Sequence, residues 1–185
     1  MKYFKNQLIW LAGVALLAGA CNKDEQNVAP TDDNEAITTA TLTLTNKATP
    51  TESVTATIEN LNTTPDFSNA TLNLKANTAY TGVISLLDKT KTPVLDATTE
   101  IREKANEHLF VYTPTPSNLL TITLTDIDTN PSPGPYPIGL TTEMKTGAAG
   151  SGKLKVVLRH QPNAKNGTAA PGSSDLDTDF TVVVK

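Results

Sequence analysis

The stretch Ile37–Thr45, with the sequence ITTATLTLT, alternates between apolar residues and threonine with a period of two. Successive side chains of a β-strand point to opposite faces, so this alternation predicts a strand whose β-branched threonines form the solvent face. Seven further short runs show similar β-type patterns between polar, glycine or proline breaks, at residues 54–58, 70–74, 80–87, 109–113, 119–125, 153–160 and 180–184. These runs and their punctuation predict an all-β protein.

Length and composition narrow the architecture that these strands can form. The chain has 185 residues and a net charge of -4, and it is 38% hydrophobic but only 5% aromatic. The core is therefore expected to consist of Val, Leu and Ile, which suits the close packing of one sheet on another. We predict a single antiparallel, Ig-like β-sandwich of seven to nine strands over residues 36–185.

One stretch does not fit the strand pattern. Residues Asp96–Glu107, with the sequence DATTEIREKANE, are rich in charged residues and lack the period-two alternation. Thr98 or Thr99 could cap a short helix with acidic residues in its first turn. A charged crossover between the two sheets fits the same residues, and both alternatives stay open.

The first 21 residues carry a targeting signal. Lys2 and Lys5 precede an apolar run of about a dozen residues, which is too short for a membrane-spanning helix of about 20. Small residues then lead directly to Cys21, the only cysteine in the chain. This ending resembles the lipobox of bacterial lipoproteins, although Leu17 lies one place before the position where that family most often has leucine. The resemblance covers these residues alone.

The lipobox resemblance implies a processing route and a location. Residues 1–20 would be a signal peptide, Cys21 would carry palmitate and other lipid, and the acidic residues 21–35 would form a flexible tether. Asn22 after the cysteine is similar to the outer-membrane sorting pattern, and Lys23–Gln26 resembles the export signal of surface-exposed lipoproteins. Surface display and a periplasmic orientation both stay open. The chain has no Lys/Arg cluster, which argues against a nucleic-acid partner.

The C-terminal third carries a second resemblance. Its loop sequences, including Thr146–Leu154, Leu158–Pro162 and Pro171–Asp175, resemble small uncharacterised Gram-negative lipoproteins associated with TonB-dependent receptors. That resemblance implies an accessory role in nutrient capture beside an outer-membrane receptor. The proline-rich loop 129–139 and the loop 161–174 are long enough to be functional, and a tolerated insertion is the competing explanation.

Two groups of side chains with oxygen ligands could form calcium sites. Asp126, Asp128 and Asn130 match the opening of a calcium loop, but Pro131 and Pro137 stand where glycine and a bidentate acid are needed. The alternative is an Asp/Asn-rich turn at a strand end. Asp175, Asp177 and Asp179 would share one face of an extended segment, where we expect solvent to hydrate them.

The two histidines form the main candidate site. His108 begins one predicted strand and His160 ends another, so the imidazoles meet at one end of the sandwich if the strands are antiparallel neighbours. Glu103 and Glu107 could then complete a zinc or copper site. The competing explanation is that each histidine caps a strand end with one hydrogen bond.

The sequence favours a binding protein over an enzyme. It contains none of the nucleophile-elbow, phosphate-loop or dinucleotide motifs, and its only tryptophan, Trp10, precedes the predicted domain. We therefore expect a membrane-anchored, non-enzymatic binding or accessory module. A metal-binding lipoprotein and an extracellular polymer hydrolase with an acid pair in a cleft are the alternatives.

Overall fold

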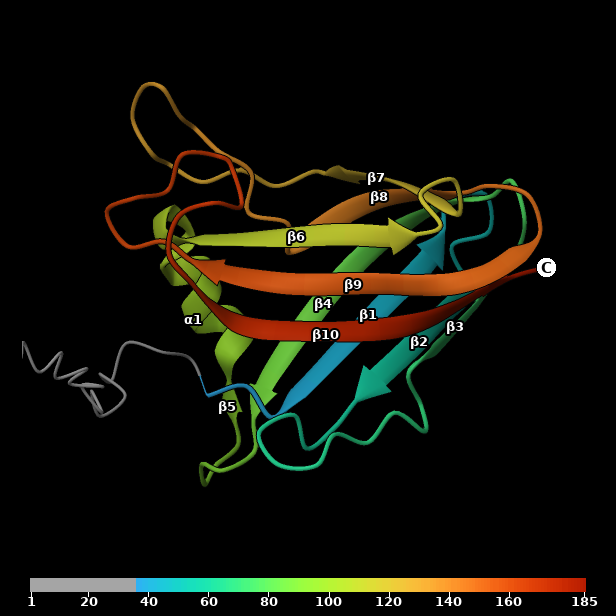
Figure 1. Cartoon of the computed structure of the whole chain (residues 1–185), viewed down its shortest axis with the longest axis horizontal. Coiled ribbons are helices and arrows are strands. Elements are labelled where there is room, and N and C mark those ends of the chain that lie inside the picture. The colour runs from blue at the N-terminus through green and yellow to red at the C-terminus, as the bar shows by residue number, and fades with distance from the viewer. Residues whose placement is uncertain (1–35) are drawn as a thin grey trace, which may run out of the picture. The chain divides into compact units, whose positions relative to one another are not determined.

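The structure, a computed structural model, describes residues 36–185. Cys21, the expected signal peptide 1–20 and the expected tether 21–35 lie outside the described residues. The described residues form ten strands in two sheets (Figure 1). One sheet has the order β2 (Ser53–Ile58), β1 (Thr39–Asn46), β4 (Ala79–Asp88), β8 (Thr141–Thr146) and β7 (Leu120–Leu124), with β5 (Leu95–Asp96) paired to β4. The other has the order β3 (Thr71–Leu74), β10 (Ser173–Val184), β9 (Gly150–His160) and β6 (His108–Thr115).

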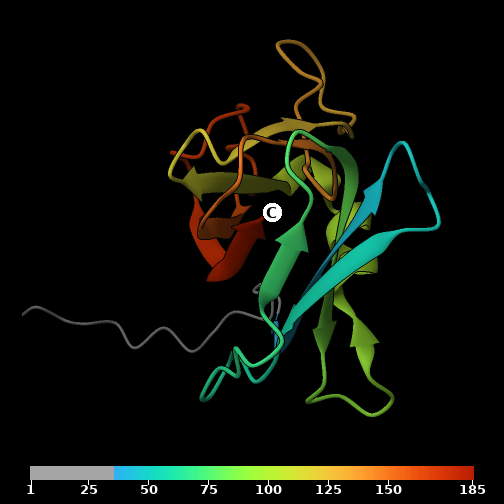
Figure 2. The same cartoon turned by 90° about the vertical axis from the view of Figure 1, so that its right-hand side faces the viewer.

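The two sheets pack face to face, so the predicted all-β sandwich is confirmed, although its ten strands exceed the predicted seven to nine and one pair is not antiparallel. All neighbouring strands are antiparallel except β3 and β10, which run parallel. Figure 2 shows β9 and β10, in orange and red, on one side and β1 and β2, in blue and blue-green, on the other. The interface is fully buried and largely aliphatic, with Leu42, Ile84, Leu158, Phe110 and Phe180 among its largest side chains.

The alternating stretch that predicted the first strand behaves as expected. Ala40, Leu42 and Leu44 of β1 are fully buried, and the threonines between them lie on the outer face. There Thr41 and Thr43 face threonines of β2 directly across the ladder, with hydroxyl separations of 3.1 and 3.2 Å. Such cross-strand threonine pairs stabilise a sheet, which explains the abundance of threonine without a functional role.

Two strands were not predicted from the sequence, and the physical reason is clearest for β8. Its buried positions are Thr142, Met144 and Thr146, so its core face is mostly threonine. Only Met144 is apolar on this core face, and the outer face is polar as well, so the contrast between the two faces is weak. The period-two signal is therefore faint, although the strand lies between β4 and β7 in the sheet.

The charged stretch after β5 forms a helix, α1 (Ala97–Glu103), followed by a 3-10 turn, η1 (Ala105–Glu107). The prediction that Thr98 or Thr99 caps this helix was wrong, because the N-cap is Asp96, whose carboxylate accepts from the Thr98 N–H at 3.0 Å. The Thr98 side chain is buried, and its hydroxyl pairs with both the N–H and the carbonyl of Leu86. This contact fixes α1 against β4.

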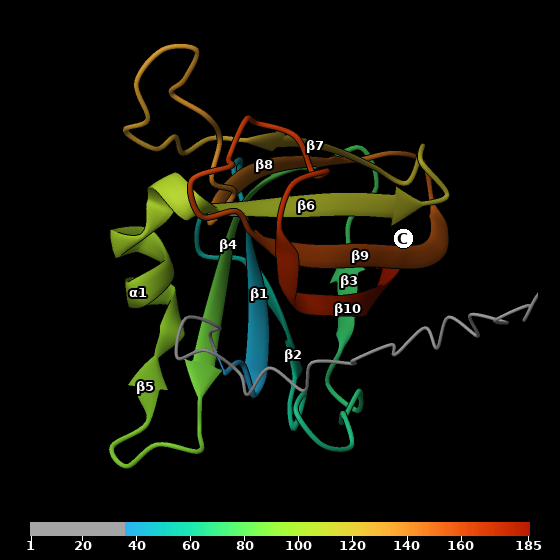
Figure 3. The ribbon, with the colours of Figure 1, turned by 60° about the vertical axis from the view of Figure 1, so that its left-hand side comes forward.

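One end of the sandwich carries most of the irregular chain, and we call it the α1 end. It comprises α1, the Pro-rich loop (residues 125–140) and the β9–β10 loop (residues 161–172), which lie near one another in Figures 1 and 3. The turn η1, which follows α1, is hydrogen-bonded to both loops. The Lys165 ammonium of the β9–β10 loop donates to the Ala105 carbonyl, and the Thr129 N–H of the Pro-rich loop donates to the Asn106 side chain. Strands β6 and β7 are the edge strands of their sheets on the side that reaches this end.

Candidate functional site at the α1 end

The structure brings His108 and His160 together, because it meets the condition that the sequence left open. Strands β6 and β9 are antiparallel neighbours, and the two histidines lie directly opposite each other in the register. Their rings stack with centroids 4.9 Å apart and an angle of 10° between the ring planes. His108 is fully buried and His160 is 5% exposed, so both imidazoles belong to the end of the core.

The predicted metal site does not form from these residues. A histidine binds a metal through a lone pair in the plane of its ring, and two rings stacked in nearly parallel planes cannot direct both lone pairs at one ion. Glu107 lies 3.7 Å from His160 Nε2, but Glu103 is exposed on α1. Within residues 36–185, no group of three or more His, Cys, Asp or Glu side chains could hold a metal ion.

Asp175 joins the histidines, which the sequence did not predict. Its carboxylate oxygen Oδ2 lies 3.7 Å from His108 Nε2, and both side chains are fully buried. The register of β9 and β10 shifts between Ser174 and Leu176, so Asp175 is the extra residue of a β-bulge. A bulge re-aims a side chain, and this one turns Asp175 into the sandwich.

The other two carboxylates of that group lie on the outer face as expected. Asp177 pairs with Lys155, and Asp179 lies 3.8 Å from Lys153. The expectation of one common face for all three was wrong because it assumed unbroken alternation. The bulge inserts one residue, and one inserted residue reverses the face of everything before it.

The surroundings of the buried His108–Asp175 pair contain few hydrogen-bonding groups. His108 Nδ1 donates to the Lys104 carbonyl at 3.0 Å, so Nδ1 carries a hydrogen. Among residues 36–185, neither His108 Nε2 nor either Asp175 oxygen has a hydrogen-bond partner. Buried polar groups without partners are costly, and the pair places the imidazole and the carboxylate side by side at the end of the core.

A second buried pair links the two long loops. Lys165 of the β9–β10 loop donates to Asp128 of the Pro-rich loop at 2.8 Å, and their side chains are 1% and 0% exposed. Asp128 also accepts from the N–H groups of Asn130 and Tyr136. Burial alone would raise the pKa of Asp128, but the hydrogen bonds from Lys165, Tyr136 and Asn130 outweigh it and hold the pKa below its usual range.

This network corrects the calcium hypothesis for the Pro-rich loop. The Lys165 ammonium lies against the carboxylate that was considered as a calcium ligand. The Asp126 carboxylate accepts from the N–H groups of Gly139 and Leu140, at 2.8 and 3.0 Å. Both carboxylates therefore organise the loop, in agreement with the alternative of an Asp/Asn-rich turn.

The loops also touch through an aromatic ring. Gly167 has a φ of +80°, and a Cβ atom at this position would come within 2.9 Å of the Tyr136 ring. Glycine is thus required both by the backbone conformation and by the closeness of the ring. Together with the Lys165–Asp128 pair, this contact makes one structure of two loops that are distant in the sequence. We call this structure the rim.

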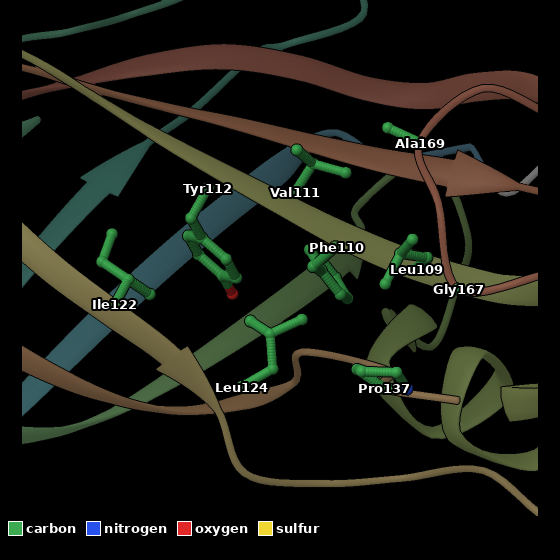
Figure 4. A pocket seen from close by; sticks show the side chains of 9 residues that line it. All are labelled: Leu109, Phe110, Val111, Tyr112, Ile122, Leu124, Pro137, Gly167 and Ala169. Carbon is green, nitrogen blue, oxygen red and sulfur yellow. The ribbon is translucent and has the colours of Figure 1, made fainter. Parts of the chain in front are cut away.

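An apolar cleft of about 280 Å³ opens between β6, β7 and the rim (Figure 4). Both edge strands contribute to it, and so does each of the two loops. Its lining residues are Leu109, Phe110, Val111, Tyr112, Ile122, Leu124, Pro137, Gly167 and Ala169. Sequence reasoning missed this cleft, because no local pattern tells which edge strands of the two sheets face each other.

The Pro-rich loop lies against β6 through two hydrogen bonds and one close approach of its backbone. The Phe110 N–H donates to the Ile138 carbonyl at 2.7 Å, and the Tyr112 hydroxyl donates to the Gly139 carbonyl at the same distance. Gly139 has a φ of +91°, and an added Cβ would lie 2.8 Å from the Phe110 Cβ. The loop therefore lies directly on the strand, and the cleft wall is preformed.

Comparison of the chain with protein-family models, with curated proteins and with solved structures finds no match. Over residues 36–185, no helix combines the length and the apolar character needed to cross a membrane.

Proposed function

We propose that this protein is a lipid-anchored, non-enzymatic binding module of the outer membrane that presents the α1 end of its sandwich to a partner. The lipobox ending at Cys21 supports the anchorage. The rim supports the binding role, and it is the observation that carries the proposal.

The rim has the properties of a recognition surface. Loops are where binding residues concentrate, and a rigid loop loses little conformational freedom when it binds. Here the Lys165–Asp128 pair and the Gly167–Tyr136 contact hold two long loops in one arrangement beside an apolar cleft. A loop that was inserted without a function would need no fixed conformation. A buried charged pair is costly unless both charges are well paired, so its presence indicates that the conformation of these loops matters.

The partner that best fits the sequence is an outer-membrane receptor. The resemblance of the C-terminal third to lipoproteins associated with TonB-dependent receptors includes Pro171–Asp175, which spans the end of the β9–β10 loop and the bulge. The rim would then contact the receptor, and the module would assist nutrient capture.

Replacing Cys21 with alanine tests the anchorage. We expect the C21A protein to leave the membrane fraction and to lose labelling by radioactive palmitate, because lipid chains on Cys21 supply the attachment. A matched C21S variant should behave identically. Membrane retention with unchanged labelling in both variants would contradict the anchor. Protease treatment of intact cells would then distinguish surface display from a periplasmic orientation.

Site-specific photo-crosslinking tests the binding surface. A photoreactive residue at the exposed Asn163 of the β9–β10 loop should form an adduct with an integral outer-membrane receptor in intact cells. The same residue at Val94, which is 53% exposed between β4 and β5, serves as the control. Equal adducts at both positions, or none at Asn163, would contradict a recognition role for the rim.

A further inference from the structure

The cleft walls are free of charged side chains. All nine lining residues are aliphatic, aromatic, proline, glycine or alanine. A charged group that entered this cleft would leave water without finding an opposite charge in the wall, which is strongly unfavourable. The cleft therefore discriminates against ions by desolvation alone.

The one side-chain hydroxyl in the wall is already used. Tyr112 donates its proton to the Gly139 carbonyl. Burial, helped by the nearby Asp126 carboxylate, raises the pKa of the phenol above its usual value, so the hydroxyl keeps its proton at neutral pH. The side chains of the wall consequently offer no free hydrogen-bond donor. These side chains therefore contribute shape and hydrocarbon to recognition rather than hydrogen bonds.

The cleft is small and preformed. Its volume of about 280 Å³ lies just below the usual range of ligand pockets, which is roughly 300–1,000 Å³. One wall is β6 with Phe110 and Tyr112, the opposite wall is β7 with Ile122 and Leu124, and the rim closes one side (Figure 4). Because contacts within the protein already fix Phe110, Tyr112 and Gly139, little ordering remains for a ligand to impose.

We propose that the cleft between β6 and β7 binds a small, uncharged ligand through a hydrocarbon group, an alkyl chain or a single aromatic ring. This inference rests on the proposed function, in which the α1 end is the binding site, and it adds the chemical class of the ligand. The molecule would enter beside the rim, with its hydrocarbon group between Tyr112 and Leu124.

Disulfide capture of small thiols tests the ligand class directly. Single-cysteine variants I122C and L124C of the full-length chain, both carrying C21S, are equilibrated with the symmetrical disulfides of hexanethiol, 2-phenylethanethiol, cysteamine and thioglycolate. Each disulfide transfers one thiol to the protein cysteine and releases the other as free thiol, and a small amount of 2-mercaptoethanol keeps the exchange reversible. Intact mass measures the fraction of each adduct. The control cysteine replaces Val83, an apolar residue that is 44% exposed on β4 and does not line the cleft. Circular dichroism checks that each variant is folded. If I122C does not fold, the test uses L124C.

The cleft cysteines should prefer the two uncharged thiols over the two charged thiols by about tenfold relative to V83C, the gain expected from burying about two methylene groups. Equal capture of charged and uncharged thiols at a folded cleft position would overturn the ligand class, and so would a preference for either charged thiol. Crosslinking at Asn163 separates the two proposals, because an adduct there alongside unselective capture refutes the ligand class and leaves the binding surface intact. Failure of both experiments refutes both.

Discussion

His108 Nε2 faces Asp175 Oδ2 across 3.7 Å in a fully buried place, and neither atom has a hydrogen-bond partner among the described residues. The pair lies at the base of the β9–β10 loop. His108 is paired with His160, the last residue before this loop, and Asp175 follows closely after Ser173, the first residue of β10. The same loop contributes Lys165 to the rim and Gly167 to the cleft. The polar end of the core and the candidate binding surface are thus connected through one loop.

Removing the Asp175 carboxylate should destabilise the protein. We expect D175A to lower the free energy of unfolding by about 3 kcal/mol, the lower end of the cost of breaking a buried pair, because it leaves His108 Nε2 buried without its neighbouring carboxylate. D175N should retain most of the stability, since an amide of the same shape keeps a polar group beside His108. Urea unfolding followed by circular dichroism measures both values. The control D177A removes an exposed carboxylate of the same strand and should have little effect.

The Lys165–Asp128 pair should hold the rim together. We expect K165M to cost about 3–5 kcal/mol, because it leaves the buried Asp128 carboxylate without its cation. Amide hydrogen exchange should accelerate in the Pro-rich loop while the β1 and β4 amides remain protected. The control K155M removes an exposed lysine that also pairs with an aspartate. Unchanged exchange in the Pro-rich loop of K165M would show that other contacts suffice to fix the rim.

The contribution of Asp128 should depend on pH in a defined direction. Its pKa is lower in the folded protein than in the unfolded chain, so the unfolded state takes up the proton first as the pH falls. The stabilisation is therefore complete above the unfolded value of about 3.9 and disappears as the pH falls through the folded value. The difference in unfolding free energy between wild type and D128N should be constant near pH 6 and shrink below about pH 4. A difference that stays constant to pH 2.5 would contradict this linkage.

Gly139 should not tolerate a side chain. Its φ of +91° is unfavourable for alanine, and the added Cβ would press on Phe110. We expect G139A to lower stability by about 1–3 kcal/mol, the usual cost of a strained backbone position. Thermal unfolding measures the loss. G150A is the matched control, since a Cβ at Gly150 would have its nearest contact at 3.7 Å and the backbone there does not have a positive φ.

The sequence determined those features that depend on alternation within one strand. The threonine face of β1, the eight expected strands and the positions of His108 and His160 at strand ends all follow from a side-chain period of two, which a short segment adopts whatever its neighbours. The strand β8 was missed because Met144 is the one apolar residue on its core face, and Asp96 was missed as the helix cap because the threonines beside it are also good capping residues.

The tertiary structure alone decided the features that make the candidate site. Asp175 turns inward because β10 pairs with β9 through a bulge, and an extra residue in a ladder is defined only by the partner strand. Lys165 and Asp128 meet because two loops from different sheets fold over the same end. The cleft exists because β6 and β7 are edge strands that face each other across the sandwich. Each of these depends on contacts between residues distant in the chain, and a period read within one segment carries no information about them.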